Sequence, residues 1–205
     1  MPRKPRLVLP NYPHHVVQRG NRRQQTFFCD ADYKYYIRLI SEAAAHCDST
    51  ILAYCLMPNH VHLVVIPKDK TGLAKLFQEA HKQYTRYINQ RNDWRGHLWQ
   101  ERFHSFAMDE RHLLAAVRYV ELNPVRAKLC DHAWDWRWSS VHAHLANKDD
   151  DLVSVSPMLN RINDWHSYLG EPLEEEMLKT IRKKSNTGRP AGSKDFLTLL
   201  SKIYE

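Results

Sequence analysis

Residues 50–66 have the sequence TILAYCLMPNHVHLVVI, in which two apolar runs flank the pair Pro58-Asn59. The runs at 50–56 and 60–66 are rich in β-branched and aliphatic residues, a composition typical of strands. Proline presets the backbone angle φ and asparagine tolerates turn conformations, so the pair predicts a tight turn. The stretch therefore predicts a β-hairpin, and the unbroken apolar run at 63–66 indicates that its second strand is covered on both faces.

On either side of the hairpin, the sequence alternates between strand and helix patterns. It predicts a strand at 14–18, a helix from Asp30 or Asp32 to about 46, a helix over about 71–91, a strand at 103–108, and a helix that Asp109 caps and that ends near 122, before Pro124. The resulting order β-α-β-β-α-β-α is that of a ferredoxin-like or RRM-like α+β sandwich. We therefore expect a four- to five-stranded antiparallel sheet with helices on one face.

The pattern loosens beyond residue 130, where three tryptophans precede a short helix and an acidic loop. A chain of 205 residues, 43% of them hydrophobic, is long enough for one domain and a smaller appendage. We place the main domain at residues 1–147 and a small helical extension at 148–205. The extension is predicted to hold one helix at about 171–184 and a final helix after Pro190.

The charge balance indicates a polyanionic partner. The chain carries 30 Lys and Arg against 23 Asp and Glu, a net charge of +7, and its basic residues fall in several clusters. Its Trp and Tyr side chains can stack on the bases of single strands. The positive charge and the lack of an acidic metal cluster disfavour a divalent-metal hydrolase of small phosphate esters.

The sequence also indicates a cellular compartment. No apolar run approaches the roughly 20 residues of a membrane span, and the first residues lack the apolar core of a signal peptide. The four cysteines form no C-x-x-C pair, so neither a disulfide framework nor a zinc knuckle is indicated. We therefore expect a cytoplasmic, nucleoid-associated protein without a membrane partner.

His60 and His62 lie two residues apart on a predicted strand, so their side chains point to one face and can converge on one cation. Spacing alone is weak, because a chain with 13 histidines is expected to contain such a pair by chance. His142 and His144 have the same spacing but are predicted on a helix, where positions i and i+2 diverge. Burying the first pair is costly unless something satisfies it. A metal site thus competes with two histidines hydrogen-bonded at a sheet edge.

Two stretches in combination carry a resemblance to a known family: MPNHVHL at residues 57–63 and RYVELNPVRA at residues 118–127. Together they resemble the single-tyrosine HUH transposases, and within that superfamily the REP-associated tyrosine transposases. Further matches are RGN at 19–21, LWQERF at 98–103 and WSS at 138–140. The resemblance covers about residues 10–145, so the nuclease domain would be the main domain at 1–147.

The resemblance implies a metal-dependent enzyme that nicks single-stranded DNA. By this resemblance, His60 and His62 bind Mg²⁺ or Mn²⁺, and Tyr119 attacks the scissile phosphate to form a 5′-phosphotyrosine. Asn123 stands where family members place a third metal ligand, one helical turn after the tyrosine. The implied substrates are hairpins of repetitive extragenic palindromes (REP), cleaved in their flanking single strands.

The residues themselves leave several alternatives open. Tyr119 and Asn123 share a helix face at i and i+4, and an amide with two imidazoles leaves positions open for phosphate oxygens. Asn123 directly precedes a proline at a helix end, so a capping role is an equal alternative. Tyr84 and Tyr87, on another predicted helix, can stack on a base or fill the core. A nucleic-acid-binding module that has this fold but does not cleave is the rival function.

Basic residues on four segments are the candidates for contact with DNA, although a solvated basic face is the alternative for each. They are Arg19, Arg22, Arg23, Lys82, Arg86, Arg118, Arg126 and Arg189. Arg189 lies in TGRP at 187–190, which resembles half of a minor-groove hook but also suits a plain linker turn. The sequence leaves open whether the chain acts as a monomer or as a homodimer.

Overall fold

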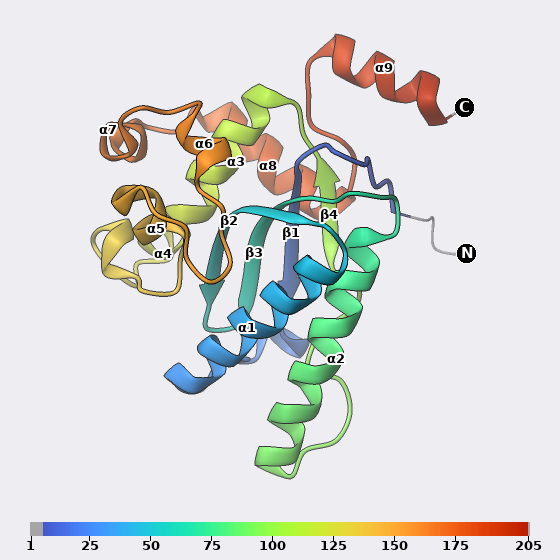
Figure 1. Cartoon of the computed structure of the whole chain (residues 1–205), viewed down its shortest axis with the longest axis vertical. Coiled ribbons are helices and arrows are strands. Elements are labelled where there is room, and N and C mark those ends of the chain that lie inside the picture. Colours follow the sequence, from blue (N-terminus) through green and yellow to red (C-terminus); the bar gives the residue numbers. More distant parts are fainter. Residues whose placement is uncertain (1–5, 205) are drawn as a thin grey trace.

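The computed structural model describes residues 6–204, and its centre is a four-stranded antiparallel sheet in the order β2-β3-β1-β4 (Figure 1). Its strands are β1 (His14–Arg19), β2 (Thr50–Met57), β3 (His60–Ile66) and β4 (His104–Ala107). β2 and β3 form the predicted hairpin, and β1 lies between β3 and β4. The predicted α+β class with an antiparallel sheet is confirmed.

Helices of very different lengths lie between the strands and after them. They are η1 (Asn21–Arg23), α1 (Asp30–His46), α2 (Gly72–Asn92), α3 (Glu110–Glu121), α4 (Asn123–Arg126), η2 (Ala133–Asp135), α5 (Val141–Ala146), α6 (Ser156–Leu159), α7 (Trp165–Gly170), α8 (Glu175–Thr187) and α9 (Lys194–Tyr204). α3 begins as predicted, because the Asp109 carboxylate accepts a hydrogen bond from the His112 backbone N–H at 3.0 Å. Within residues 6–204, no helix is long and apolar enough to cross a membrane.

Helices cover both faces of the sheet, which corrects the expectation of helices on one face. α1 and α2 pack on one face, and α3 with α8 packs on the other (Figure 1). The reason lies in the strands: the neighbouring residues Leu56 and Met57 of β2 point to opposite faces, yet they are only 0% and 2% exposed. A sheet that is apolar on both faces needs a second layer of cover.

The segment predicted as an extension supplies much of this second layer. Trp165, Tyr168 and Ile181 belong to the same buried cluster as Phe106 of the sheet and Val117 of α3. α8 lies along β4 and β1, so residues 148–205 include an element that packs directly on the sheet (Figure 1).

The strand register places a group of polar side chains at one end of the face covered by α3 and α8. Arg19 pairs with His60, and Val17 pairs with His62, across β1 and β3. Because paired residues in an antiparallel ladder point to the same face, Arg19, His60 and His62 share a face, and so does His15, two residues before Val17. The predicted orientation of the two histidines on one face is confirmed.

The other His-x-His pair diverges as expected. On α5, the His142 side chain is exposed whereas His144 is fully buried. The two imidazoles therefore cannot serve one ion.

Gly20, directly after β1, lies where the chain is too crowded for a side chain. A Cβ atom would stand 2.4 Å from the Gln24 carbonyl oxygen and 2.7 Å from Cγ2 of Thr26. We expect Gly20→Ala to lower the free energy of unfolding by about 2 kcal/mol, because backbone must move to relieve the clash. Urea denaturation measures this change. Gly170→Ala is the control, because a Cβ there meets nothing within 4 Å; equal midpoints for the two variants would contradict the prediction.

Candidate active site

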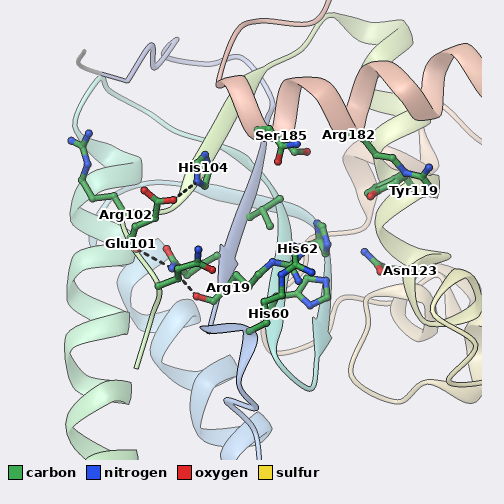
Figure 2. A pocket seen from close by; sticks show the side chains of 15 residues that line it. Arg19, His60, His62, Glu101, Arg102, His104, Tyr119, Asn123, Arg182 and Ser185 are labelled. Carbon is green, nitrogen blue, oxygen red and sulfur yellow. Dashed lines mark hydrogen bonds and ion pairs between the residues drawn. The ribbon is translucent and has the colours of Figure 1, made fainter. Parts of the chain in front are cut away.

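A cavity of about 600 Å³ opens at the ends of β1 and β3, where the sheet meets α3, α8 and the loop before β4 (Figure 2). Four residues singled out for chemistry line this cavity: His60, His62, Tyr119 and Asn123. The two histidines come from β3, whereas the tyrosine and the asparagine come from α3 and the start of α4. The cavity thus brings together two segments that lie about 60 residues apart in the sequence.

The turn before β3 fixes the orientation of His60. The Asn59 amide nitrogen donates to the Arg23 carbonyl at 3.0 Å, so the amide oxygen is the atom that faces His60. Nδ1 of His60 lies 2.6 Å from that oxygen and must carry the proton. Nε2 of His60 is therefore left with a lone pair for a ligand.

His62 is held by a third histidine that the sequence reading did not single out. Its Nδ1 lies 2.9 Å from Nε2 of His15, and the two rings stack with centroids 5.1 Å apart. The rings of His60 and His62 stand 5.0 Å apart at 75°. Because Nδ1 of each ring is engaged, Nε2 is the nitrogen that remains available in both.

Burial keeps both candidate ligands neutral at physiological pH. Burial, and then the Arg19 guanidinium, lowers the pKa of His60 to about 3. Burial, followed by the charge of His60, holds the pKa of His62 well below its usual range. A neutral imidazole is the form that binds a metal, so both side chains are in the required state.

Tyr119 is held over the histidines by packing. Its ring stands edge-on to those of His62 and His15, with centroids 5.9 Å away in each case. The Arg126 guanidinium lies 3.8 Å from the centre of the Tyr119 ring and donates to the Tyr119 carbonyl at 2.6 Å. The ring is thus confined by imidazoles and by a cation.

The rival tyrosines lie elsewhere. Tyr84 of α2 points into the core and is fully buried, and its hydroxyl donates to the Thr26 carbonyl at 2.8 Å. The Tyr87 hydroxyl donates to Asp32. Neither lines the cavity, whereas Tyr119 does.

Asn123, the third ligand that the resemblance implies, is a mostly buried residue of the cavity lining. It is 7% exposed, and its side chain makes no hydrogen bond with any residue in the described range 6–204. The C-cap of α3 is Leu122, and Asn123 provides no side-chain cap. No side-chain hydrogen bond supports the capping alternative in the described residues, and the ligand role stays a prediction.

The donor set fits a hard or borderline divalent cation. Across residues 6–204, no group of three or more His, Cys, Asp or Glu side chains is arranged to hold a metal. The candidate set is instead two neutral imidazoles and one amide oxygen. Such a set matches Mg²⁺ or Mn²⁺ that also binds phosphate oxygens of a substrate.

The predicted basic residues divide into two groups. Arg19 and Arg23 line the cavity, and Arg126 lies against Tyr119. Arg189 lines a neighbouring cavity of about 640 Å³. Its TGRP segment forms the turn after α8, with Gly188 at a φ of 66°.

The second group lies away from the cavity. Arg22 is exposed on η1, and Lys82 and Arg86 are exposed on α2. Arg118 forms an ion pair with Glu171 at 2.7 Å and lies over the Tyr168 ring. Its guanidinium is therefore engaged on another side of α3 from Tyr119.

Several lining residues were not anticipated from the sequence. They are Arg182, Ser185 and Asn186 of α8, together with Gln100, Glu101, Arg102 and His104 before and in β4. Figure 2 shows Arg182 and Ser185 on α8, and it shows Glu101, Arg102 and His104 on the side of the histidines away from Tyr119 and Asn123. The LWQERF motif was a signal for the second group. For α8, the sequence periodicity predicted a helix but did not indicate which strands the helix packs against.

Comparison with known protein families assigns the chain to a class of protein, the transposases. The family model described as Transposase IS200 like matches residues 9–123, which is more than half of the 205 residues. The chain belongs to the IS200-like transposase family, a family of DNA-cleaving enzymes.

Individual relatives agree with this assignment. A REP-associated tyrosine transposase of Escherichia coli (strain K12) is 25% identical over 132 residues, covering 64% of this chain and 76% of the relative. A solved REP-associated tyrosine transposase bound to a REP hairpin has a TM-score of 0.62 at 21% identity, covering 75% of this chain and 92% of that one. The resemblance to this group, first seen in the motifs, is confirmed.

A putative transposase from Deinococcus radiodurans R1 is more distant. Its structure has a TM-score of 0.42 at 16% identity, covering 58% of this chain and 95% of that one. This similarity is too low to support an argument about the site.

Proposed function

We propose that this protein is a metal-dependent endonuclease and strand transferase for single-stranded DNA that acts beside REP-type palindromic hairpins. The observation that carries the proposal is the meeting of His60, His62, Tyr119 and Asn123 in one cavity. Membership of a transposase family supports DNA as the substrate. The likeness to a relative solved with a REP hairpin supports the hairpin.

The chemistry follows from the positions of the side chains. Mg²⁺ or Mn²⁺ held by His60, His62 and Asn123 would polarise the scissile phosphate as a Lewis acid. The Tyr119 hydroxyl oxygen forms a bond to phosphorus, and the bond from phosphorus to the 3′ oxygen breaks. The phenol releases one proton and the leaving oxygen takes up one, which yields a 5′-phosphotyrosine and a free 3′-hydroxyl. Attack by a 3′-hydroxyl reverses the step, so rejoining needs no nucleotide cofactor.

The charge around the cavity suits a DNA backbone. Arg19, Arg23, Arg102 and Arg182 line the cavity, and the chain as a whole carries a net charge of +7. Basic side chains bind phosphates without reading sequence, so they hold the strand while other contacts select it.

A covalent-adduct assay tests the proposal. The protein is incubated with Mn²⁺ and end-labelled single strands that flank REP-type hairpins, and the products are separated under denaturing conditions. We expect a protein–DNA adduct that survives denaturation and disappears when EDTA removes the metal. Binding of the hairpins without an adduct, across a panel of such substrates, would support the non-cleaving DNA-binding alternative.

The Asn59–His60 contact leads to a prediction about metal affinity. Asn59→Ala removes the acceptor that keeps the proton on Nδ1 of His60, and loss of such a supporting contact typically weakens metal binding by 10–100-fold. We expect the Mn²⁺ dissociation constant, measured by calorimetry, to rise by about 10-fold. Asn59→Asp keeps an oxygen acceptor and should bind at least as well as the alanine variant. Wild-type affinity in Asn59→Ala would contradict the assigned role.

A further inference from the structure

His62 is connected through His15 to the C-terminal helix α8. Nδ1 of His62 lies 2.9 Å from Nε2 of His15, and Nδ1 of His15 lies 3.4 Å from the Ser185 hydroxyl oxygen. That hydroxyl in turn lies 2.8 Å from the Ile181 carbonyl oxygen. The contacts form an unbroken chain from a backbone carbonyl of α8 to the edge of the cavity.

The distances give this chain a direction. The Ser185 hydroxyl has a single hydrogen, and the Ile181 carbonyl is the closer acceptor at 2.8 Å, against 3.4 Å for His15. The Ser185 hydroxyl therefore donates its hydrogen bond to the Ile181 carbonyl. The lone pairs of the hydroxyl oxygen are left to accept a hydrogen bond from Nδ1–H of His15.

A neutral imidazole carries only one N–H, so His15 must accept at Nε2 once it donates at Nδ1. His15 is 0% exposed and stacked on the His62 ring, and a charge is costly to bury beside an uncharged ring, so His15 is taken as neutral. Its neighbour His62 must then donate from Nδ1 and keep its lone pair at Nε2. The opposite direction would place the proton of His62 on Nε2 and block it as a ligand.

We propose that His15 and Ser185 are positioning residues that hold His62 in the Nδ1–H tautomer and thereby present its Nε2 to the metal ion. This inference rests on the proposed metal site. Ser185 lies outside residues 9–123, the part of the chain that matches the family, so α8 adds a supporting contact to a site whose histidines lie within that part.

His60 and His62 are then prepared in the same way from different directions. Asn59 accepts the Nδ1 proton of His60 at 2.6 Å, and His15 accepts that of His62 at 2.9 Å. Both rings offer Nε2 at the same end of the sheet. Supporting contacts of this kind raise metal affinity because the ligand need not change tautomer on binding.

The first test reads the tautomer directly in the metal-free, full-length protein. Long-range ¹H–¹⁵N spectra of histidine-labelled protein distinguish the two tautomers, and a His62→Asn variant assigns the signal. We expect the Nδ1–H tautomer for His62 in the wild type and in Ser185→Thr, which keeps the hydroxyl. In Ser185→Ala we expect a mixture of tautomers. Finding Nε2–H at His62 in the wild type would overturn the inference.

The second test measures Mn²⁺ affinity by calorimetry, without DNA. Ser185→Ala is expected to raise the dissociation constant by about 10-fold, and Ser185→Thr to restore it towards the wild-type value. Ser201→Ala is the matched control, because the Ser201 hydroxyl also donates to a carbonyl of its own helix, at Thr198, but Ser201 is an exposed residue of α9 outside the cavity. An unchanged tautomer and an unchanged affinity in Ser185→Ala would refute the role of Ser185.

The design separates this inference from the proposed function. A wild-type protein that binds no Mn²⁺ would refute the metal site, while the tautomer spectra would still show whether the chain of hydrogen bonds exists. His15→Gln gives a further check, because its amide oxygen can accept from His62 without help from Ser185. In that background, Ser185→Ala should no longer change the dissociation constant; a persisting 10-fold effect would contradict transmission through His15.

Discussion

Tyr119→Phe is expected to abolish the covalent adduct while the protein keeps its fold and its affinity for DNA. The substitution removes only the attacking oxygen, and the ring contacts with His62, His15 and Arg126 remain. Loss of a nucleophile commonly lowers turnover by a factor on the order of 10⁴ or more. Adduct yield on denaturing gels, together with a DNA-binding measurement on the same preparation, checks both parts of the expectation.

Two other tyrosines provide the controls. Tyr87→Phe and Tyr84→Phe also remove one hydroxyl each, from side chains that bond to Asp32 and to the Thr26 carbonyl outside the cavity. Both variants should still form the adduct, although loss of a buried hydrogen bond in Tyr84→Phe should cost about 1 kcal/mol of stability. An adduct that persists in Tyr119→Phe would remove the assigned nucleophile and leave the metal site untouched.

Local signals predicted the parts of the fold that local chemistry determines. The Pro58-Asn59 turn sets the hairpin, and Asp109 caps α3 as expected. The two-residue period of a strand was enough to place His60 and His62 on one face. These features depend on residues within a few positions of one another, so they can be predicted from short stretches of sequence.

Contacts between distant segments were not predictable in the same way. Arg118 and Tyr119 are neighbours in sequence, yet a helix turns by about 100° per residue, and Arg118 pairs with Glu171 instead of facing the cavity. His15 was assigned to a strand, but its contact with Ser185 spans 170 positions. Helix periodicity showed that α8 is a helix without showing which strand it covers.

The helix that carries Tyr119 is anchored by a buried carboxylate two residues further on. Glu121 is 0% exposed. Its Oε1 lies 2.6 Å from the Ser140 hydroxyl and 2.7 Å from Nδ1 of His144, and its Oε2 accepts from the Trp165 indole N–H at 2.8 Å. The partners come from α5, the residue before it and α7, so this one side chain connects α3 to the C-terminal half of the second layer.

We expect Glu121→Ala to lower the free energy of unfolding by about 3–5 kcal/mol, because Ser140, His144 and Trp165 lose their shared partner inside an apolar layer. Urea denaturation measures this loss. Glu110→Ala is the matched control on the same helix, because its ion pair with Arg161 is partly exposed and contributes about 1 kcal/mol or less.

The same substitution separates stability from chemistry. Glu121 does not line the cavity, so Glu121→Ala should form the adduct at low temperature, where it stays folded, and lose it on warming together with its structure. Circular dichroism and adduct yield should therefore fall over the same temperature range. An unfolding free energy within about 1 kcal/mol of the wild type would show that the carboxylate does not hold α3 in place. The position of Tyr119 over the histidines would then depend on packing of the apolar face of α3 alone.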